Sequence, residues 1–271
     1  MALTTLQRDI CKLIAAQRIE SGESYLAGGA ALNAVMGAGR VSRDLDLFHD
    51  TAEALAATWD ADTHLLEARG YRVEVVRERP SFVEAIVSRG EARVLVQWAQ
   101  DSAYRFFPLV RHDELGLILH PFDLATNKVL ALAGRVEPRD WVDTIECHER
   151  IQGLGFLSWA ACGKDPGFSP RAILDHAART ARYSAGEISA LSFEGPAPDA
   201  GELARRWKRC LGEAEHVIAL LPEVEAGKAV VDPEGGIYRG APDDVARDLA
   251  QGIMRFHAGA IRGAWPRVMP R

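Results

Sequence analysis

The stretch of residues 26–48 constrains the fold of this chain more than any other part of the sequence. Two adjacent glycines, Gly28 and Gly29, follow the apolar run Tyr25–Ala27 and precede the helix-forming run Ala30–Met36. Glycine permits a tight turn at the end of a strand, and the first turn of the next helix presents backbone N–H groups that have no partner within the helix. The order strand, glycine turn and short helix therefore predicts a place where a phosphate can approach the backbone closely.

The next segment, Val41–Phe48, alternates as a half-buried strand should, with Asp44 and Asp46 on the same face as Ser42. Residues i and i+2 of a strand lie about 6.5–7 Å apart, so two such carboxylates can converge on one or two Mg²⁺ ions. An isolated pair of this kind more often lies on the solvated face of a strand and binds no metal. Aspartate is disfavoured in strands, however, and the glycine turn lies directly upstream, so the two features together favour a metal site.

The first half of the chain is expected to mix helices with strands. Thr4–Ile19 has the apolar periodicity of an amphipathic helix, with Thr4 or Thr5 available as the N-cap. A second long helix is expected at Thr51–Arg69. Strands are expected at Tyr71–Val76, Phe82–Ser88 and Ala92–Trp98, the last two joined as a hairpin through Arg89, Gly90 and Glu91.

The second half reads as mainly helical. The expected helices are Phe122–Ala133, Pro138–Ile151, Pro170–Arg182, Gly201–Leu221 and a last one from about Pro242 to Arg262, with a small hairpin within Lys228–Gly240. We therefore predict an α+β chain: a domain with a mixed sheet and helices over residues 1–120, then a mainly helical region over residues 121–271.

Composition excludes several classes of protein. No run approaches the roughly 20 apolar residues of a membrane span, and the N-terminal residues carry charges where a signal peptide has none, so we expect a cytoplasmic protein without a membrane partner. The four cysteines are widely spaced and predict buried, reduced thiols, not a zinc site or a disulfide framework. A net charge of −6 gives no overall attraction to nucleic acid.

Four ordered motifs resemble a known family. The sequences around Gly28-Gly29 and Asp44-Leu45-Asp46 look like the hG[GS]…DhD signature of the DNA polymerase β nucleotidyltransferase superfamily, with fourteen residues between Gly29 and Asp44. The run Asp123–Leu132 and the run Pro138–Asp143 resemble the lysine helix and the RDxxD motif of one branch. The chain is similar, over roughly residues 20–150, to the AbiEii family of abortive-infection and toxin–antitoxin nucleotidyltransferases.

The resemblance implies a fold of the polymerase β type and a set of site residues. Asp44 and Asp46 would hold Mg²⁺, and Gly28, Gly29 and the backbone of Ala30 would bind the triphosphate of an NTP such as ATP. Lys128 would stabilise negative charge on the triphosphate or the leaving pyrophosphate. The remaining catalytic candidates are Asp140, which could orient Lys128 or the acceptor, Asp143 on the same helical face, and Ser42. Ser42 occupies the place of a serine in the toxin relatives and is also a candidate for binding the nucleotide. The resemblance further implies that residues 121–150, the first part of the helical region, complete the active site.

The sequence departs from the superfamily at one important position. These enzymes usually add a third carboxylate from a neighbouring strand, where Gln97 appears to stand in this chain. Glutamine cannot replace a charged ligand. Glu84 and Asp101 are the alternatives that the sequence offers, without a means of placing either.

The expected function is transfer of a nucleotide from an NTP to an acceptor, with tRNA the first acceptor to test and protein the second, as the toxin-like member of a pair with a cognate antitoxin. Two alternatives stay open: an NTP-binding module of the same fold without turnover, and an enzyme that modifies a small molecule, as antibiotic nucleotidyltransferases do. Two groups of cationic side chains could hold an RNA acceptor, although solvated helix faces are an ordinary alternative: Arg171, Arg179 and Arg182, and Arg205, Arg206, Lys208 and Arg209. Lys128, expected to face a phosphate from a helix, should contribute little to folding.

Overall fold

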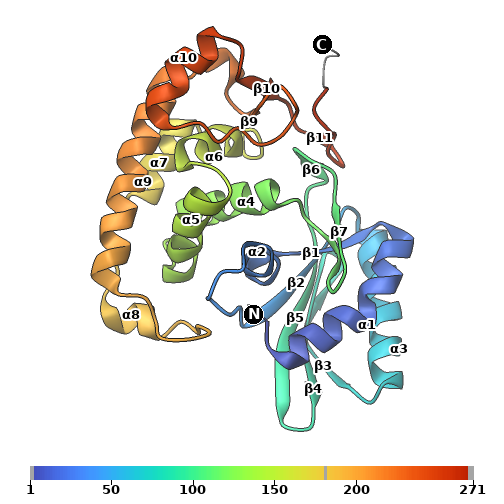
Figure 1. Ribbon diagram of the computed structural model, residues 1–271. Coiled ribbons are helices and arrows are strands. Elements are labelled where there is room, and N and C mark those ends of the chain that lie inside the picture. Colours follow the sequence, from blue (N-terminus) through green and yellow to red (C-terminus); the bar gives the residue numbers. More distant parts are fainter. Residues whose placement is uncertain (1–2, 180–181, 268–271) are drawn as a thin grey trace. The chain divides into compact units, whose positions relative to one another are not determined.

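A computed structural model describes residues 3–179 and 182–267 and divides into two compact units. The first unit comprises Met1–Ala103, Leu109–His120 and Ser192–Gly195, and the second comprises Tyr104–Pro108, Pro121–Leu191 and Pro196–Arg271. Figure 1 labels the elements of both. The chain therefore crosses from one unit to the other several times, and residues 192–195 return to the first unit to pair with Arg40 and Val41.

The first unit is built on a mixed sheet of seven strands in the order β3-β4-β5-β2-β1-β8-β7. Strand β2 runs parallel to β5, strand β1 runs parallel to β8, and the other neighbours are antiparallel. The bounds are β1 Ser24–Ala27, β2 Asp44–His49, β3 Arg72–Arg79, β4 Phe82–Arg89, β5 Ala92–Gln100, β7 Val110–His112 and β8 Gly116–Ile118. The two strands that frame the candidate site, β1 and β2, thus lie inside the sheet.

The central strands alternate between a buried face and a half-buried face. Leu45, Leu47 and Trp98 point to the buried face and are fully enclosed. Asp44 and Asp46 point to the opposite, half-buried face. Side chains alternate between the two faces along the strand, as the sequence predicts, so the aspartates lie away from the main core.

Helices cover the two faces differently. Figure 1 shows α1 (Thr5–Ser21) and α3 (Ala52–Ala68) on one side of the sheet and α2 (Gly28–Met36) on the other. The expected N-cap of the first helix is confirmed, because the Thr4 side chain accepts from the Gln7 backbone N–H and the Gln7 side chain accepts from the Thr4 N–H. Helices α1 and α3 are joined by a fully buried ion pair, in which Arg18 Nη2 lies 2.9 Å from Asp62 Oδ2.

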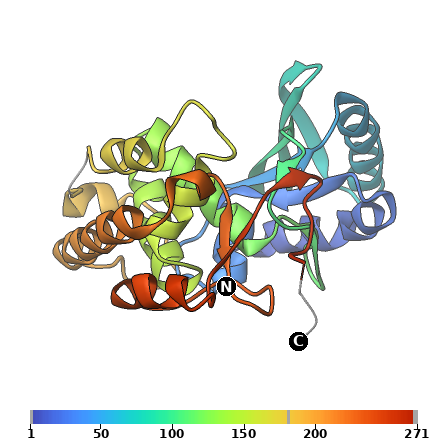
Figure 2. The same ribbon diagram turned by 90° about the horizontal axis from the view of Figure 1, so that it is seen from above.

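The second unit is mainly helical (Figure 2). Its helices are α4 Pro121–Gly134, α5 Pro138–Arg150, α6 Leu154–Ala161, α7 Pro170–Ala177, α8 Ala185–Ser189, α9 Ala200–Leu220 and α10 Val245–Ala250, with short 3₁₀ turns at Glu223–Glu225 and Pro242–Asp244. Two pairs of short strands complete it: β9 Ala229–Val231 with β10 Arg255–His257, and β6 Tyr104–Arg105 with β11 Ala260–Ile261. One part of its core packs Phe156, Trp159 and Val217 against Val230 and Tyr238.

The predicted α+β fold class is confirmed, because a mixed sheet with helices is followed by a mainly helical region. The four cysteines, Cys11, Cys147, Cys162 and Cys210, are buried free thiols. In the described part of the chain, the helices are all too short or too polar to cross a membrane.

The largest error of the sequence interpretation lies near the C-terminus. A helix was expected from about Pro242 to Arg262, but α10 ends at Ala250 and residues 255–261 form β10 and β11. Gly252 adopts a left-handed conformation (φ 68°) that ends the helix, and the chain then finds strand partners in β9 and β6. The expected hairpin within 228–240 is reduced to a single bridge between Val231 and Ile237, because β9 pairs with β10 instead.

Other boundaries differ by less. Helix α2 begins at Gly28 and not at Ala30, strand β2 begins at Asp44 and not at Val41, and α6 was not expected. The helix expected over 170–182 ends as α7 at Ala177, and residues 180–181 of that expectation lie outside the described residues.

The buried ion pair between α1 and α3 gives the first prediction. Arg18 Nε also donates to Ser24 Oγ, and Trp98 Nε1 donates to the same Asp62 oxygen that Arg18 contacts, so the carboxylate is held by two elements. Arg18→Met should lower the free energy of unfolding by about 3–5 kcal/mol, because Asp62 is left as an uncompensated buried charge. The double variant Arg18→Met, Asp62→Asn should recover much of that loss. Urea denaturation measures the free energy of unfolding of both variants. A smaller loss in the single variant than in the double variant would contradict the role assigned to the buried ion pair.

Candidate functional site

The glycine turn packs directly against the second aspartate. Strand β1 ends at Ala27, which pairs with Asp46 on β2, so Gly28 follows immediately beside that carboxylate. Gly28 has a positive φ of 63°, and a Cβ built there would lie 1.7 Å from Asp46 Oδ2. Any other residue would collide with the carboxylate and strain the backbone. The glycine is therefore required by the position of Asp46.

The second glycine has a different neighbour. A Cβ on Gly29 would lie 2.7 Å from Arg40 Nη2 and 3.0 Å from Ser42 Oγ, so a guanidinium and a hydroxyl are packed against the start of α2. Arg40 and Ser42 are both buried, as is Ala30, the third residue of the turn. The N-cap residue of α2 is Ala27, whose methyl side chain makes no capping hydrogen bond. The first backbone N–H groups of α2 carry the partial positive charge of a helix N-terminus.

Ser42 orients the first aspartate. Its hydroxyl donates to Asp44 Oδ1 at 2.9 Å, and its own carbonyl accepts from Gln7 Nε2 at 2.9 Å. Ser42 precedes β2 and does not belong to it, but the hydrogen bond from Gln7 fixes its place. The hydroxyl is thus used to hold a carboxylate.

Asp44 and Asp46 fit a magnesium ion that is completed by substrate. They share the half-buried face of β2, and the described residues contain no group of three or more His, Cys, Asp or Glu side chains arranged to hold a metal. Mg²⁺ is commonly bound through one or two carboxylates together with substrate phosphates and water, and not by a closed protein cage. A pair of carboxylates beside a glycine turn and a helix N-terminus matches this mode of binding.

The two carboxylates have an extended polar neighbourhood across the sheet. Asp46 pairs with Gln97 on β5, and Gln97 pairs with Glu84 on β4, so the three residues form one row on one face. Gln97 Nε2 donates to Glu84 Oε1 at 2.8 Å. Glu84, which the sequence could not place, therefore lies two strands from Asp46, whereas Asp101 follows the end of β5.

In the helical unit, the structure brings together Lys128, Asp140 and Asp143. Lys128 Nζ on α4 lies 2.9 Å from Asp140 Oδ1 and 3.3 Å from Asp143 Oδ2, both on α5, and Arg135 Nε lies 2.8 Å from Asp140 Oδ2. Both carboxylates are fully buried, and the Lys128 side chain is 8% exposed. These ion pairs join α4 to α5.

The charged partners of Asp140 lower its pKa. Burial by itself raises the pKa of this carboxyl, but the charges and hydrogen bonds of Lys128 and Arg135 outweigh burial and hold the pKa below its usual value. Asp140 is therefore ionised in the folded protein at neutral pH. Lys128 was expected to matter little for folding, but its burial between two carboxylates reverses that expectation.

Several cations proposed as acceptor-binding residues are paired with acidic neighbours. Arg171 contacts Asp175 and Glu215, Arg205 contacts Glu202, and Arg206 contacts Glu146 and Glu149. Arg179 donates to backbone carbonyls of His176 and Ala133. Exposed cations that remain available on these helices and their flanks are Lys208, Arg209 and Arg182. The basic surface is thus smaller than the sequence suggested.

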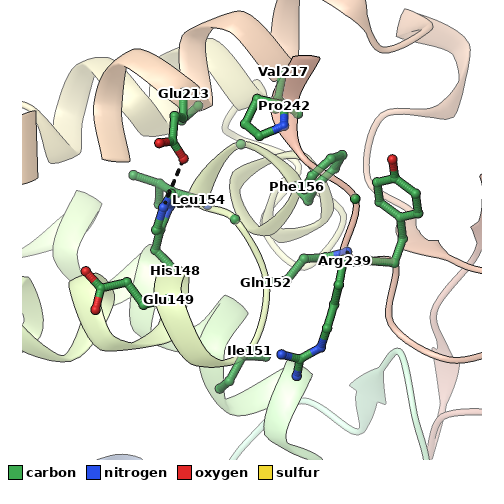
Figure 3. A pocket seen from close by; sticks show the side chains of 15 residues that line it. His148, Glu149, Ile151, Gln152, Leu154, Phe156, Glu213, Val217, Arg239 and Pro242 are labelled. Atoms are coloured by element: carbon green, nitrogen blue, oxygen red, sulfur yellow. Dashed lines mark hydrogen bonds and ion pairs between the residues drawn. The ribbon is translucent and has the colours of Figure 1, made fainter. Parts of the chain in front are cut away.

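A cavity of about 330 Å³ lies in the helical unit among α5, α6 and α9 (Figure 3). His148 on its wall accepts from the Leu154 N–H through Nδ1 and contacts Glu213 through Nε2 at 3.2 Å, the contact drawn as a dashed line. Burial lowers the pKa of His148, so a neutral imidazole with a proton on Nε2 fits both contacts. With the carboxylates of Glu149 and Glu213 on its wall, this cavity is a poor place for a triphosphate.

Sequence reasoning missed two features of the site. Arg40 was assigned no role, although an arginine close to a glycine turn is a signal for an anion site. The pairing of Gln97 with Glu84 depends on strand register, which the sequence alone leaves open.

The fold has counterparts among solved structures. A putative nucleotidyltransferase from Helicobacter pylori is 15% identical and aligns with a TM-score of 0.54 over 79% of this chain and 96% of its own. JHP933 from Helicobacter pylori is 15% identical, with a TM-score of 0.55 over 80% of this chain and 95% of its own. MenT4, a nucleotidyltransferase toxin from Mycobacterium tuberculosis, is 16% identical, with a TM-score of 0.50 over 76% of this chain and 80% of its own.

Sequence comparison adds nothing to these likenesses: no protein-family model matches the chain, and no curated protein matches it. At 15–16% identity, the structural likeness shows the fold. The architecture that sets Gly28 and Gly29 beside Asp46 is the fold of proteins described as nucleotidyltransferases, among them a nucleotidyltransferase toxin.

Proposed function

We propose that this protein is a Mg²⁺-dependent nucleotidyltransferase that moves a nucleotide from an NTP to an acceptor. The observation that carries the proposal is the contact between Gly28 and the Asp46 carboxylate, where a Cβ would lie 1.7 Å from the oxygen. A turn that must stay free of side chains, at the N-terminus of a helix and beside two carboxylates, is what a joint metal and triphosphate site requires. The shared fold supports the same reaction class.

The candidate site residues of the first unit each have a role in this proposal. Asp44 and Asp46 hold the metal, and the Ser42 hydroxyl keeps Asp44 in place through its 2.9 Å hydrogen bond. The backbone N–H groups of Gly28, Gly29 and Ala30 bind phosphate oxygens, and the Arg40 guanidinium adds positive charge beside the turn. Bound Mg²⁺ would neutralise phosphate charge as the bond to the leaving pyrophosphate breaks.

The proposal keeps Lys128, Asp140 and Asp143 as residues of the same activity, on the strength of the motif resemblance. In this role the two aspartates position the Lys128 ammonium group, and Lys128 stabilises negative charge on the phosphates. Their buried ion pairs make the three residues part of the helical core as well, so their substitution has a cost in stability that must be separated from any effect on turnover.

For the acceptor, we propose tRNA first and protein second, in a toxin-like protein with a cognate antitoxin. The likeness to MenT4, described as a nucleotidyltransferase toxin, supports this assignment. The net charge of −6 and the ion-paired state of Arg171, Arg205 and Arg206 weaken the case for RNA relative to protein. The acceptor therefore has to be identified by labelling, and not by charge.

Transfer of label tests the proposed function. With Mg²⁺ and α-³²P-labelled NTPs, the protein should label tRNA or a protein in a cell extract, whereas γ-³²P-labelled NTPs should give no label because the γ-phosphate leaves in pyrophosphate. Asp46→Asn should reduce labelling by at least about 100-fold, because it replaces a charged metal ligand with a neutral side chain of nearly the same shape.

Asp60→Asn, an exposed carboxylate on α3, is the matched control and should label like the wild type. Labelling from the γ position would show phosphoryl transfer instead and overturn the proposal. Mg²⁺-dependent NTP binding without transfer to tRNA, protein or an aminoglycoside would leave a binding module of the same fold and contradict the enzymatic assignment.

The buried lysine gives a separate prediction about stability. Lys128→Ala should lower the free energy of unfolding by about 3–5 kcal/mol, because Asp140 and Asp143 stay buried with one cation fewer. Arg135→Ala removes the other partner of Asp140 from a half-exposed position, so solvent screening should keep its cost at about 1 kcal/mol or less. Chemical denaturation of the two variants side by side measures the difference. Equal midpoints would show that the buried pairs of Lys128 do not hold the helices together in solution.

A further inference from the structure

One polar row crosses three strands of the sheet next to the candidate metal site. Register places Asp46 on β2 beside Gln97 on β5, and Gln97 beside Glu84 on β4. All three side chains are half-buried and belong to the same face, since neighbours in register point to the same side of a sheet. The row therefore continues the carboxylate pair of β2 across the sheet.

The amide of Gln97 is oriented by Glu84. Its Nε2 donates to Glu84 Oε1 at 2.8 Å, and a carboxylate oxygen is an acceptor and not a donor. The nitrogen and oxygen of an amide lie on opposite sides of the side-chain axis. When Nε2 turns toward β4, Oε1 turns toward β2, which carries Asp46. A reversed amide would set two oxygens against each other, so the hydrogen bond selects this orientation.

The alternation of charged, neutral and charged groups has a physical reason. Like charges directly opposite on adjacent strands destabilise a sheet, so a glutamate at position 97 would be repelled by both Asp46 and Glu84. A neutral glutamine avoids this repulsion and still has a side-chain oxygen. Amide oxygens of Asn and Gln are ordinary ligands of hard cations.

We propose that Gln97 supplies its amide oxygen to the Mg²⁺ held by Asp44 and Asp46, and that Glu84 is the positioning residue that turns the amide toward it. The inference rests on the proposed function, because it concerns the same metal. It explains how a chain with glutamine in place of a third carboxylate retains a third oxygen ligand. Hydrogen-bond partners of metal ligands commonly change affinity by about 10–100-fold when they are removed.

Metal affinity of the full chain tests the proposal without reference to turnover. Mn²⁺ serves as the probe, titrated in the presence of ATP and followed by the loss of the free-ion electron paramagnetic resonance signal. Gln97→Ala and Glu84→Ala, which remove the amide oxygen and the acceptor that orients it, should each weaken Mn²⁺ binding by about 10-fold or more. Gln100→Ala, an exposed glutamine at the end of the same strand, is the matched control and should bind like the wild type.

An exchange of the two side chains sharpens the test. In the double variant Gln97→Glu, Glu84→Gln, the amide at position 84 can donate to the new carboxylate at position 97, so the hydrogen bond is kept in reverse. The metal then has three carboxylates, and Mn²⁺ should bind more tightly than to the wild type. Gln97→Glu alone places two carboxylates in contact and should gain less than the double variant. Melting temperatures without metal show whether each variant is folded.

The outcomes separate the inference from the function on which it rests. If Asp46→Asn loses Mn²⁺ while Gln97→Ala and Glu84→Ala bind it like the wild type, Gln97 is not a ligand and the inference is wrong, but the proposed function stands. If the wild type binds Mn²⁺ in a way that Asp46→Asn does not alter, both fail. A folded double variant that binds Mn²⁺ more weakly than the wild type also contradicts the inference.

Discussion

The close approach of the Gly28 backbone to the Asp46 carboxylate is the constraint on which the rest of the site depends. It follows from the antiparallel pairing of β1 with β2, which sets Ala27 opposite Asp46 and starts α2 at the next residue. The helix can begin there only because Gly28 has no side chain and tolerates a φ of 63°. One contact thus fixes the position of the helix N-terminus relative to the carboxylates, and hence the place where a phosphate and a cation could be bound together.

The chain uses its buried charges in two ways. Arg18 with Asp62, and Lys128 with Asp140 and Asp143, are ion pairs enclosed within their units, where each buried carboxylate is compensated by a cation that joins two helices. Asp44 and Asp46 instead lie on the half-buried face of β2, next to a glycine turn. Charges of the first kind are costly to remove singly because a partner is left buried, whereas we propose that the second kind binds a metal ion.

How far the sequence predicts this structure depends on the range of the interactions. Short-range signals were sufficient for the Thr4 cap, the glycine turn and the shared face of Asp44 and Asp46, because each follows from local backbone geometry. Long-range pairing decided what the sequence missed. The segment 255–261 looked helical but pairs with β9 and β6, Lys128 looked exposed but is enclosed by α5, and Gln97 meets Glu84 only through strand register. Local propensity yields to tertiary contacts in each case.

The central claim, that the turn and the two aspartates form one site for metal and triphosphate, is tested most directly by calorimetric titration of an NTP in the presence and absence of Mg²⁺. The account predicts that Mg²⁺ strengthens NTP binding to the wild type and that the double variant Asp44→Asn, Asp46→Asn loses this dependence while it stays folded. It also predicts that Gly28→Ala, whose Cβ would displace the Asp46 carboxylate, weakens binding of the NTP and removes most of the effect of Mg²⁺. NTP affinity that is the same with and without Mg²⁺, and the same in the double variant, would contradict the account.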